Sequence, residues 1–395
     1  MKKRIKKVIK KYVKFLMVKV IQLIHLIFNM IYKLDDKQVL FLSDVREVLG
    51  GNLKEMYDYL EGKDYKRILC LKKERRVRRS FKEKIHLIKL LSTSKYVLLD
   101  DYSMSISMMI VRKGQEVVQL WHGPGAFKTM GYSRHDKAFS FLDKYNGHMN
   151  YTKSIVTADG VRWCFAEAFG ISKDNVHAAG FPRTDCFFDK KYIEKTRKEF
   201  FKKYPELKNK KIILFAPTYR GENLKVANYD FSTLDIDDIY KSLHKDYVFL
   251  FKLHPALYNN IDKGIVTMPD LSDYKDFYYD FSSYRDINDL LMITDVLITD
   301  YSSVIFDYAL LNKPVVYFTY DLELYENDRG LYYEFKDYVY GSVSKNSKEL
   351  VKAIKDGKMM NDKRKAFMKK FMEACDGKST EKTFKLIFEG NKKEK

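Results

Sequence analysis

Two histidines follow short apolar stretches that are typical of buried strands. His122 comes directly after residues 117–121 and precedes a Gly-Pro-Gly turn, and His254 comes directly after residues 247–253. Glycines let a loop turn sharply, so such a loop can present an imidazole ring in a cleft. Because the unperturbed pKa of histidine lies near neutrality, either ring is a candidate general base. The alternative for each is a histidine packed in its own loop.

Cationic and hydroxyl side chains follow other stretches of the same kind. Thr218 and Arg220 follow residues 212–216, and Lys252 stands two residues before His254. A guanidinium group can bind two phosphate oxygens at once, and an ammonium group adds a compact positive charge. These residues are therefore candidates for binding a phosphorylated substrate. A solvated surface cation is the alternative for each.

A third group combines a carboxylate with two serines at the start of a predicted helix. Asp300, Ser302 and Ser303 follow residues 295–299 and precede an apolar helical segment. Asp and Ser are ordinary helix N-caps, so capping alone could explain one of them. Two hydroxyl groups beside the free N–H groups of a helix start also form a site that favours a phosphate. Arg329, further along the chain, adds another cation.

Several familiar kinds of site are absent from the sequence. It contains no Walker phosphate loop, no Gly-x-Ser-x-Gly motif and no His-Glu-x-x-His motif. The four cysteines stand far apart without a Cys-x-x-Cys pair, which argues against a disulfide framework or a structural zinc site and favours a reducing cytosol. We therefore expect no metal site and no obligatory cofactor, although a substrate could bring magnesium with it.

The candidate residues need a scaffold that brings strand ends together. The chain has 395 residues, of which 46% are hydrophobic, and this is enough for two domain cores. Short apolar runs alternate with helical stretches, which predicts parallel sheets with crossover helices. A lysine-rich helical segment near residues 190–210 separates two groups of runs. We predict an α/β chain of two doubly wound domains, at residues 35–190 and 191–395, with ligands beyond the carboxyl ends of the strands.

Residues 1–34 form a basic segment that we predict to be an amphipathic, membrane-associating helix. It carries nine lysines and arginines up to residue 19 and no acidic residue before Asp35, and polar positions recur every three or four residues. Such a helix suits an anionic membrane surface. The membrane-facing lysines expected here are Lys3, Lys7, Lys10, Lys11 and Lys14. The alternatives are a helix docked on the protein's own body and a membrane-spanning helix, whereas a signal peptide would need an uninterrupted apolar stretch and a cleavage site.

The order of the motifs resembles the CDP-glycerol glycerophosphotransferase family, the teichoic acid primases and polymerases of Gram-positive bacteria. The resemblance extends over residues 95–390 and rests on Trp-His-Gly at 121–123, Gly-Phe-Pro-Arg-Thr-Asp at 180–185, Ala-Pro-Thr-Tyr-Arg at 216–220, Leu-His-Pro at 253–255, Thr-Asp-Tyr-Ser-Ser at 299–303 and Arg-Gly at 329–330. It implies a GT-B fold, in which two Rossmann-like domains face a cleft. It also implies peripheral attachment at the cytoplasmic face of the cell membrane.

The resemblance implies a role for each candidate residue. His122 matches the family's base, and His254 matches a second essential histidine that contacts the donor diphosphate. The donor-binding positions are Thr218, Arg220, Asp300, Ser302, Ser303 and Arg329, to which we add Lys252. The acceptor-side positions are Gly123, Gly125 and Lys128. Their loop departs from the His-Gly-Thr-Pro-Leu-Lys that is more frequent in polymerases, so the tip of the acceptor site is expected to differ.

The activity that the resemblance implies is transfer of a polyol phosphate from a CDP-polyol to a hydroxyl group, with release of CMP. The acceptor is a polyprenyl-diphosphate-linked saccharide or polyol phosphate, and glycerol phosphate is the preferred unit, with ribitol phosphate as the alternative. A length of 395 residues favours a primase or a short polymerase. A glycosyltransferase that uses a nucleotide sugar is a second alternative, since fold alone does not fix function. The net charge of +20 also suits a nucleic-acid-binding module, but the densest charge accompanies an apolar helical face, so we expect no nucleic acid partner.

Overall fold

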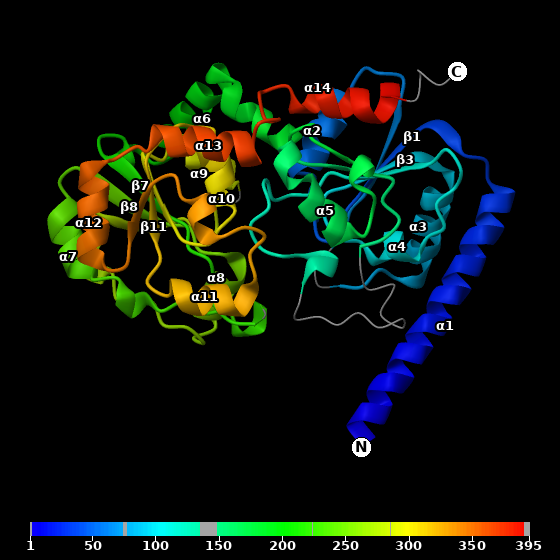
Figure 1. Cartoon of the computed structure of the whole chain (residues 1–395), viewed down its shortest axis with the longest axis horizontal. Coiled ribbons are helices and arrows are strands. Elements are labelled where there is room, and N and C mark those ends of the chain that lie inside the picture. The colour runs from blue at the N-terminus through cyan, green and yellow to red at the C-terminus, as the bar shows by residue number, and fades with distance from the viewer. Residues whose placement is uncertain (1, 74–76, 135–147, 223, 285, 391–395) are drawn as a thin grey trace. The chain divides into compact units, whose positions relative to one another are not determined.

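Two six-stranded parallel sheets organise the chain, one in each of two units (Figure 1). Unit 1 contains Met1–Asp185 and Phe371–Lys395, and unit 2 contains Cys186–Lys370. The computed structural model describes residues 2–73, 77–134, 148–222, 224–284 and 286–390, and it describes the side chains of these residues except for 2–8 and 326–329. The two sheets confirm the prediction of parallel sheets with crossover helices.

The sheet of unit 1 has the strand order β2-β1-β3-β4-β5-β6. Its strands are β1 Asp35–Leu42, β2 Lys66–Cys70, β3 Ser94–Leu99, β4 Glu116–Gln119, β5 Lys153–Ile155 and β6 Val176–His177. The second half of β1 and most of β3 are buried, as expected of parallel strands that are covered on both faces. In the register of the sheet, Leu42 lies beside Leu99, and Leu99 lies beside Gln119. The residues that follow these three strands therefore emerge together at one edge.

Helices cover this sheet and begin and end at recognisable signals. They are α2 Gly51–Tyr59, α3 Phe81–Thr93, α4 Met104–Met108, α5 Arg162–Phe169 and α14 Ser379–Phe384. At the start of α3 the Ser80 hydroxyl accepts the Glu83 N–H, and the Glu83 carboxylate accepts the Ser80 N–H, which forms a capping box. Helix α5 ends at Gly170, whose φ of 62° provides the left-handed residue that commonly closes a helix.

The C-terminal segment packs on unit 1. Phe388 lies 4.8 Å from Tyr65 and 4.6 Å from Tyr96 between ring centroids, and Ile387 joins the same core. The expected domain of residues 191–395 therefore differs from the observed unit 2, because residues 371–395 complete the core of unit 1. The boundary near residue 190 lies at residue 185 instead.

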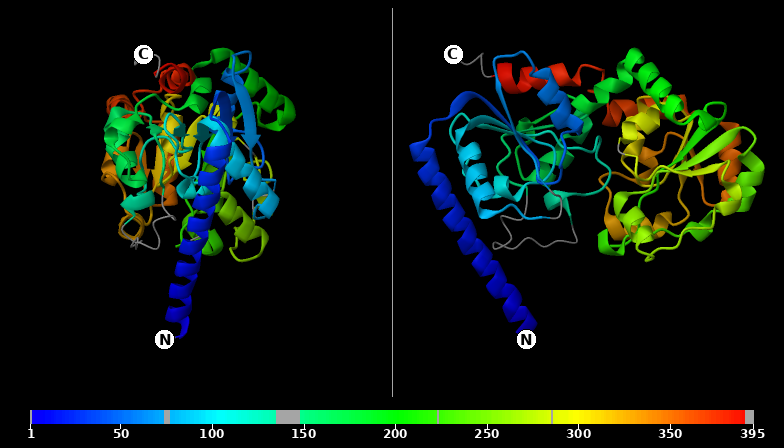
Figure 2. Two further views of the ribbon diagram at one scale, coloured as in Figure 1. Left: turned by 90° about the vertical axis from the view of Figure 1, so that its right-hand side faces the viewer. Right: turned by 180° about the vertical axis from the view of Figure 1, so that it is seen from behind.

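Helix α1, Lys2–Ile31, packs on unit 1 through a side that carries both polar and apolar residues. Val18 and His25 are only 1% exposed and, seven residues apart, they lie on the same side of the helix. Figure 2 shows α1 as one continuous rod whose C-terminal part runs beside α3. Most of its large apolar side chains are 44–86% exposed: Ile9, Tyr12, Val13, Leu16, Met17, Val20, Leu23, Leu26, Ile27, Met30 and Ile31. A surface helix ordinarily turns its apolar stripe toward the core, so this stripe is left for another partner.

The composition of α1 also bears on the expected membrane contact. The segment Ile9–Ile31 is long and apolar enough to cross a membrane, judged by length and composition alone. Lys10 is exposed, and Lys11 and Lys14 are half-buried. The side chains of Lys3 and Lys7 lie outside the described residues.

The sheet of unit 2 has the strand order β12-β11-β10-β7-β8-β9. Its strands are β7 Lys211–Phe215, β8 Tyr247–Phe251, β9 Tyr278–Asp280, β10 Val296–Thr299, β11 Val315–Phe318 and β12 Ser342–Ser344. Phe215, Phe249 and Phe251 are fully buried in an aromatic-rich core. Each such side chain contributes about 1.5–3 kcal/mol through burial, so the apolar runs that predicted these strands also hold the sheet in place.

The helices of unit 2 flank this sheet. They are α6 Lys190–Lys203, α7 Ile236–Leu243, α8 Pro255–Asp262, α9 Ile287–Ile293, α10 Val304–Ala309, α11 Leu322–Arg329, α12 Ser347–Asp356 and α13 Asn361–Phe371. Helix α6 begins at Asp189, whose carboxylate accepts the N–H groups of Lys191 and Tyr192. Helix α12 begins at Asn346 and ends at Gly357 with a φ of 54°.

Candidate active site

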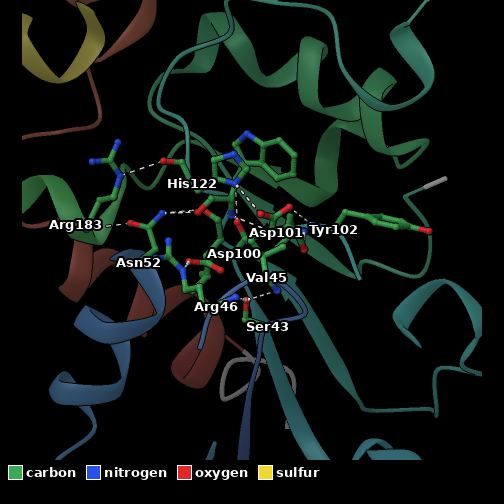
Figure 3. Close-up of polar contacts among 12 residues, drawn as sticks. Ser43, Val45, Arg46, Asn52, Asp100, Asp101, Tyr102, His122 and Arg183 are labelled. Atoms are coloured by element: carbon green, nitrogen blue, oxygen red, sulfur yellow. Dashed lines mark hydrogen bonds and ion pairs between the residues drawn. The ribbon is translucent and has the colours of Figure 1, made fainter. Parts of the chain in front are cut away.

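The strand order of unit 1 reverses between β1 and β3, and open α/β sheets bind ligands beyond the carboxyl ends of the strands at such a point. Figure 3 shows the side chains there. Arg46 Nε donates to Asp100 Oδ2 at 2.8 Å. Burial raises the pKa of the Asp100 carboxyl group more strongly than Arg46 lowers it. Gly51 makes room for this ion pair, since a Cβ there would lie 2.7 Å from Arg46 Nη2.

His122 follows β4 at the same edge of the sheet (Figure 3). Its Nδ1 lies 2.9 Å from the carbonyl oxygen of Asp100 and 3.8 Å from the carboxylate of Asp101. A carbonyl oxygen can only accept a hydrogen bond, so Nδ1 carries the proton of the neutral ring and Nε2 keeps its lone pair. The side chain is 46% exposed, so a substrate can reach it. This geometry suits a general base.

Aromatic rings pack against His122. The Trp121 indole stacks on it with ring centroids 4.5 Å apart and 27° between the planes. His148 packs 5.5 Å from Trp121, and its Nδ1 lies 2.9 Å from the Tyr151 hydroxyl. Burial, reinforced by nearby His122, lowers the pKa of His148 to about 4. His148 therefore stays neutral near pH 7 and acts as a packing residue.

The expected acceptor-side residues lie in the loop after His122. Gly125 is buried with a φ of 65°, and its N–H donates to Thr157 Oγ1 at 2.9 Å. Thr157 donates in turn to the carbonyl of Phe371 at 2.6 Å, so the C-terminal segment supports this loop. Gly123 and Lys128 are half-buried in the same loop. Their contact with an acceptor stays a prediction.

In unit 2 the strand order reverses between β7 and β10, and Arg220 and Asp300 meet at this point. Arg220 Nη1 lies 3.0 Å from Asp300 Oδ2, and its Nε and Nη2 bind both carboxylate oxygens of Asp321 at 2.5 and 2.9 Å. Burial lowers the pKa of Arg220, but the two carboxylates outweigh burial and raise it overall. Four tyrosine rings lie 5.1–5.5 Å from its guanidinium carbon: Tyr229, Tyr301, Tyr320 and Tyr325.

These contacts give Arg220 a structural role in addition to the donor binding that the sequence predicts. Its N–H groups bind Asp300, Asp321 and the carbonyl of Thr218, so it ties together the loops after β7, β10 and β11. A phosphate contact would require Arg220 to release one of these partners. Thr218 is 9% exposed, and its N–H donates to Asp300 Oδ1 at 2.8 Å. Donor binding by both residues stays a prediction.

His254 is the N-cap of α8 and is exposed. Its Nδ1 accepts the N–H of Ala256 at 3.1 Å. Because Nδ1 accepts, Nε2 carries the proton of the neutral ring and can donate a hydrogen bond. His254 and His122 therefore have opposite tautomers, and His254 has the form that suits a phosphate oxygen.

Lys252 has partners other than the expected donor phosphates. Its Nζ donates to the carbonyl oxygens of Ser282 and Tyr284 at 2.9 and 2.7 Å, and burial lowers its pKa. A half-buried ammonium group needs such acceptors, and these bonds hold the loop after β9 against the end of β8. Donor binding by Lys252 stays a prediction.

The serines at the start of α10 differ from each other. Ser302 Oγ accepts the N–H of Val304 at 3.4 Å, whereas Ser303 is exposed and makes no capping hydrogen bond. Capping thus accounts for Ser302 and leaves the hydroxyl of Ser303 directed to solvent. Contact of either with a donor stays a prediction. The side chain of Arg329 lies outside the described residues.

The structure brings the candidate residues into two groups, one at the carboxyl edge of each sheet. The candidate site residues named from the sequence did not include Arg46, Asn52, Asp100 or Asp321. One signal in the sequence could have pointed to the site in unit 1. The tripeptide Asp-Tyr-Ser follows both β3 and β10, at residues 101–103 and 300–302. Within the described parts of the chain, no three His, Cys, Asp or Glu side chains are grouped so that they could hold a metal ion.

Comparison with protein families places most of the chain in one of them. Residues 24–389 match the model of a family described as CDP-Glycerol:Poly(glycerophosphate) glycerophosphotransferase. A teichoic acid poly(ribitol-phosphate) polymerase of Bacillus spizizenii is 41% identical over 354 residues, which cover 89% of this chain and 56% of that protein. A teichoic acid ribitol-phosphate primase of the same species is 38% identical over 303 residues, which cover 75% of each chain. The chain thus spans little more than half of the polymerase.

A solved structure shows the same fold. The wall teichoic acid polymerase TagF superposes with a TM-score of 0.75 at 22% identity, over 100% of this chain and 99% of that chain. At this identity the match concerns architecture alone. It confirms the expected GT-B class, with its two Rossmann-like units.

Proposed function

Because this chain belongs to the CDP-glycerol:poly(glycerophosphate) glycerophosphotransferase family, we propose that it transfers a polyol phosphate from a CDP-polyol to an acceptor hydroxyl. The acceptor is a polyprenyl-diphosphate-linked saccharide or polyol phosphate, and the product belongs to teichoic acid synthesis. The observation that carries the proposal is the hydrogen bond from His122 Nδ1 to the Asp100 carbonyl, which leaves Nε2 as a base at an exposed strand end.

The proposed reaction is a displacement at the phosphorus that carries the polyol. The acceptor oxygen attacks the β-phosphorus, its proton goes to His122 Nε2, and the bond to the α-phosphate oxygen breaks, which releases CMP. A base at this position contributes about 10²–10⁴-fold. The Nε2–H of His254 is suited to stabilise the negative charge that develops on the leaving phosphate.

We infer that the transferred unit is ribitol phosphate. The relatives with 41% and 38% identity are named for ribitol phosphate, whereas a glycerol-phosphate primase of Bacillus subtilis is 31% identical. This inference replaces the preference for glycerol phosphate, which rested on the resemblance alone.

The test measures acceptor-dependent CMP release from CDP-ribitol and, separately, from CDP-glycerol. We expect faster release from CDP-ribitol, and His122→Gln should lower kcat by about 10²–10⁴-fold while CDP-ribitol binding is unchanged. Full activity of His122→Gln would refute its assignment as the base. Release from neither donor, together with turnover of a nucleotide sugar, would favour a glycosyltransferase. Excess EDTA in the same assay tests the expectation that no metal is obligatory, and unchanged release supports it.

We also propose that α1 attaches the enzyme peripherally to the cytoplasmic face of the membrane. The support is the packing of α1, which leaves most of its large apolar side chains exposed together with Lys10 and Lys19. An in-plane amphipathic helix buries such an apolar face at the boundary between lipid headgroups and acyl chains.

Vesicle sedimentation tests the membrane proposal. The double variant Leu16→Glu/Leu23→Glu places charges on the exposed apolar face and should weaken binding to phosphatidylglycerol vesicles by at least about tenfold. The matched control is Leu224→Glu/Ile265→Glu, which adds the same charge at exposed apolar residues of unit 2. Equal binding of both variants would contradict the proposal.

A further inference from the structure

The backbone directly before His122 is in a conformation that its sequence does not favour. Trp121 has a φ of 53°, in the left-handed region that a bulky residue rarely adopts. Such a conformation persists only where the surrounding structure over-determines it. Trp121 and His122 are adjacent in the chain. Whatever holds the backbone of Trp121 therefore also controls where the His122 ring points.

Asn52 makes the contacts that hold this backbone (Figure 3). It is fully buried in α2, and its Nδ2 donates to the carbonyl oxygens of Leu120 and Trp121 at 3.0 and 2.8 Å. Its Oδ1 accepts the N–H of Arg183 at 3.0 Å, and Arg183 Nε donates to the carbonyl of His122 at 3.1 Å. One amide thus binds the carbonyls on both sides of the strained residue.

We infer that Asn52 is a positioning residue for His122. By fixing the peptides on both sides of Trp121, it holds the His122 ring where Nδ1 meets the Asp100 carbonyl and Nε2 remains exposed. Asn52 does not itself meet the reacting atoms. The inference rests on the proposed function for its effect on turnover, and its effect on ring geometry can be measured without turnover.

The chain provides a matched control in Gln115. This residue is 3% exposed, its Nε2 donates to the carbonyls of Leu91 and Ser94 at 2.7 and 2.8 Å, and its Oε1 accepts the N–H of Arg112 at 3.1 Å. It has the same bonding pattern as Asn52, but it stands directly before β4, at the opposite end from His122. Asn52→Asp and Gln115→Glu each replace a buried amide by a carboxylate of similar size.

The first measurement compares the turnover of these two variants. Asn52→Asp should lower kcat for CMP release by about 10- to 100-fold without changing the KM for the CDP-polyol, because a catalytic group that moves by about 1 Å can lose this much rate. Gln115→Glu should stay within about twofold of the unmodified enzyme. Equal losses of kcat in the two variants would show that Asn52 is only one more buried amide and would overturn the inference.

The second measurement reads the position of the ring directly. Trp121 and Trp163 are the two tryptophans of the chain, so Trp163→Phe leaves Trp121 as the only indole. The Trp121 indole stacks on the His122 ring, so its emission depends on where that ring lies. In this background His122→Ala removes the stacked ring and calibrates the change in emission. Asn52→Asp should shift the Trp121 emission toward that of His122→Ala, and Gln115→Glu should leave it unchanged. Unchanged emission in folded Asn52→Asp would overturn the inference.

A double-mutant cycle keeps the test decisive if Asn52→Asp is poorly folded. Glycine adopts a positive φ without strain, so in a Trp121→Gly background the additional loss of stability caused by Asn52→Asp should shrink at least severalfold. An undiminished loss would count against the inference. If His122→Gln is fully active while the fluorescence results are as expected, the assignment of the base fails and the positioning of the ring stands.

Discussion

His122 and His254 differ in which ring nitrogen carries the proton, and one backbone group decides this in each case. The Asp100 carbonyl accepts from Nδ1 of His122, whereas the Ala256 N–H donates to Nδ1 of His254. The first ring can therefore take a proton at Nε2, and the second can donate one there. The residue type alone assigns neither role, since both histidines follow strands.

Arg220 should contribute to stability because its removal leaves two buried carboxylates without a cation. Asp300 and Asp321 are 1% and 13% exposed. Arg220→Met should lower the free energy of unfolding of unit 2 by about 3–5 kcal/mol in urea denaturation. The control is Lys241→Met, which breaks an exposed ion pair with Asp237 and should leave the free energy of unfolding nearly unchanged, because water screens an exposed pair. Similar costs for the two variants would show that the Arg220 cluster is not needed for the fold.

At the scale of elements, the contact of α1 with unit 1 depends on a neutral histidine. Burial, with a smaller effect of Arg112, lowers the pKa of His25 to about 4. Its Nδ1 lies 3.4 Å from the N–H of Ile110, which donates to it. Protonation would place a second cation beside Arg112 in a buried position, so the docked helix favours the neutral ring.

The docking of α1 should therefore weaken in acid. The pKa of His25 in the docked helix, about 4, lies below the ordinary histidine value of 6.5. The released helix therefore binds more protons, and docking is lost as the pH falls from 6.5 toward 4. The full effect is at most roughly 3 kcal/mol. Hydrogen exchange should show lower protection factors for residues 18–31 at pH 5 than at pH 7.5. His25→Gln should remove this pH dependence, and an unchanged dependence would identify another group as its source.

Gly180 lets the C-terminal segment approach the end of β6. It has a φ of 80°, and a Cβ there would lie 2.3 Å from Ser379 Oγ and 2.5 Å from the Ala374 carbonyl. Gly114 has the same φ of 80° with no atom within 4 Å of the added Cβ. The two glycines thus share a conformation and differ in their surroundings.

This pair separates backbone strain from steric contact. Gly114→Ala should lower the free energy of unfolding by about 1 kcal/mol through its positive φ alone. Gly180→Ala should cost about 1–3 kcal/mol more, because backbone and side-chain atoms must move apart. Thermal unfolding of both variants measures the difference. Equal melting temperatures would show that the C-terminal segment moves without cost.

At the scale of the whole molecule, the two units repeat one arrangement. In each, an arginine after the first strand pairs with a buried aspartate across the point where the strand order reverses, Arg46 with Asp100 and Arg220 with Asp300. Strand ends diverge at such a point, and a buried carboxylate there needs a cation. The candidate histidine of each unit lies one strand away from this pair, at the same edge.

The assignment of the C-terminal segment to unit 1 also leads to a prediction. Deleting residues 371–395 removes Ile387 and Phe388 from the core of unit 1, and Phe388→Ala alone should cost about 3–5 kcal/mol. Calorimetry should show a lower melting temperature for unit 1 and an unchanged one for unit 2. A shift confined to unit 2 would contradict the observed division of the chain and favour the boundary expected from the sequence.

Local patterns were sufficient for the elements and for the class of fold. Buried parallel strands need continuous apolar runs, so residues 212–216, 247–253 and 295–299 identified β7, β8 and β10 without knowledge of their neighbours. The motifs at the ends of these runs also identified the family. The period of polar residues predicted α1, but not that most of its large apolar side chains would stay exposed.

Tertiary structure decided the partners of each candidate side chain. Arg220 and Lys252 are of the residue types that bind phosphate. In the fold, however, Arg220 binds Asp321, 101 residues away, and Lys252 binds two carbonyl oxygens about 30 residues away. The tautomer of His122 depends on a carbonyl 22 residues earlier. The position of the backbone directly before His122 depends on a hydrogen bond from Asn52 in helix α2. Hydrogen bonds between distant segments leave no periodic trace in a sequence, because they depend on which strand ends meet in the folded sheet.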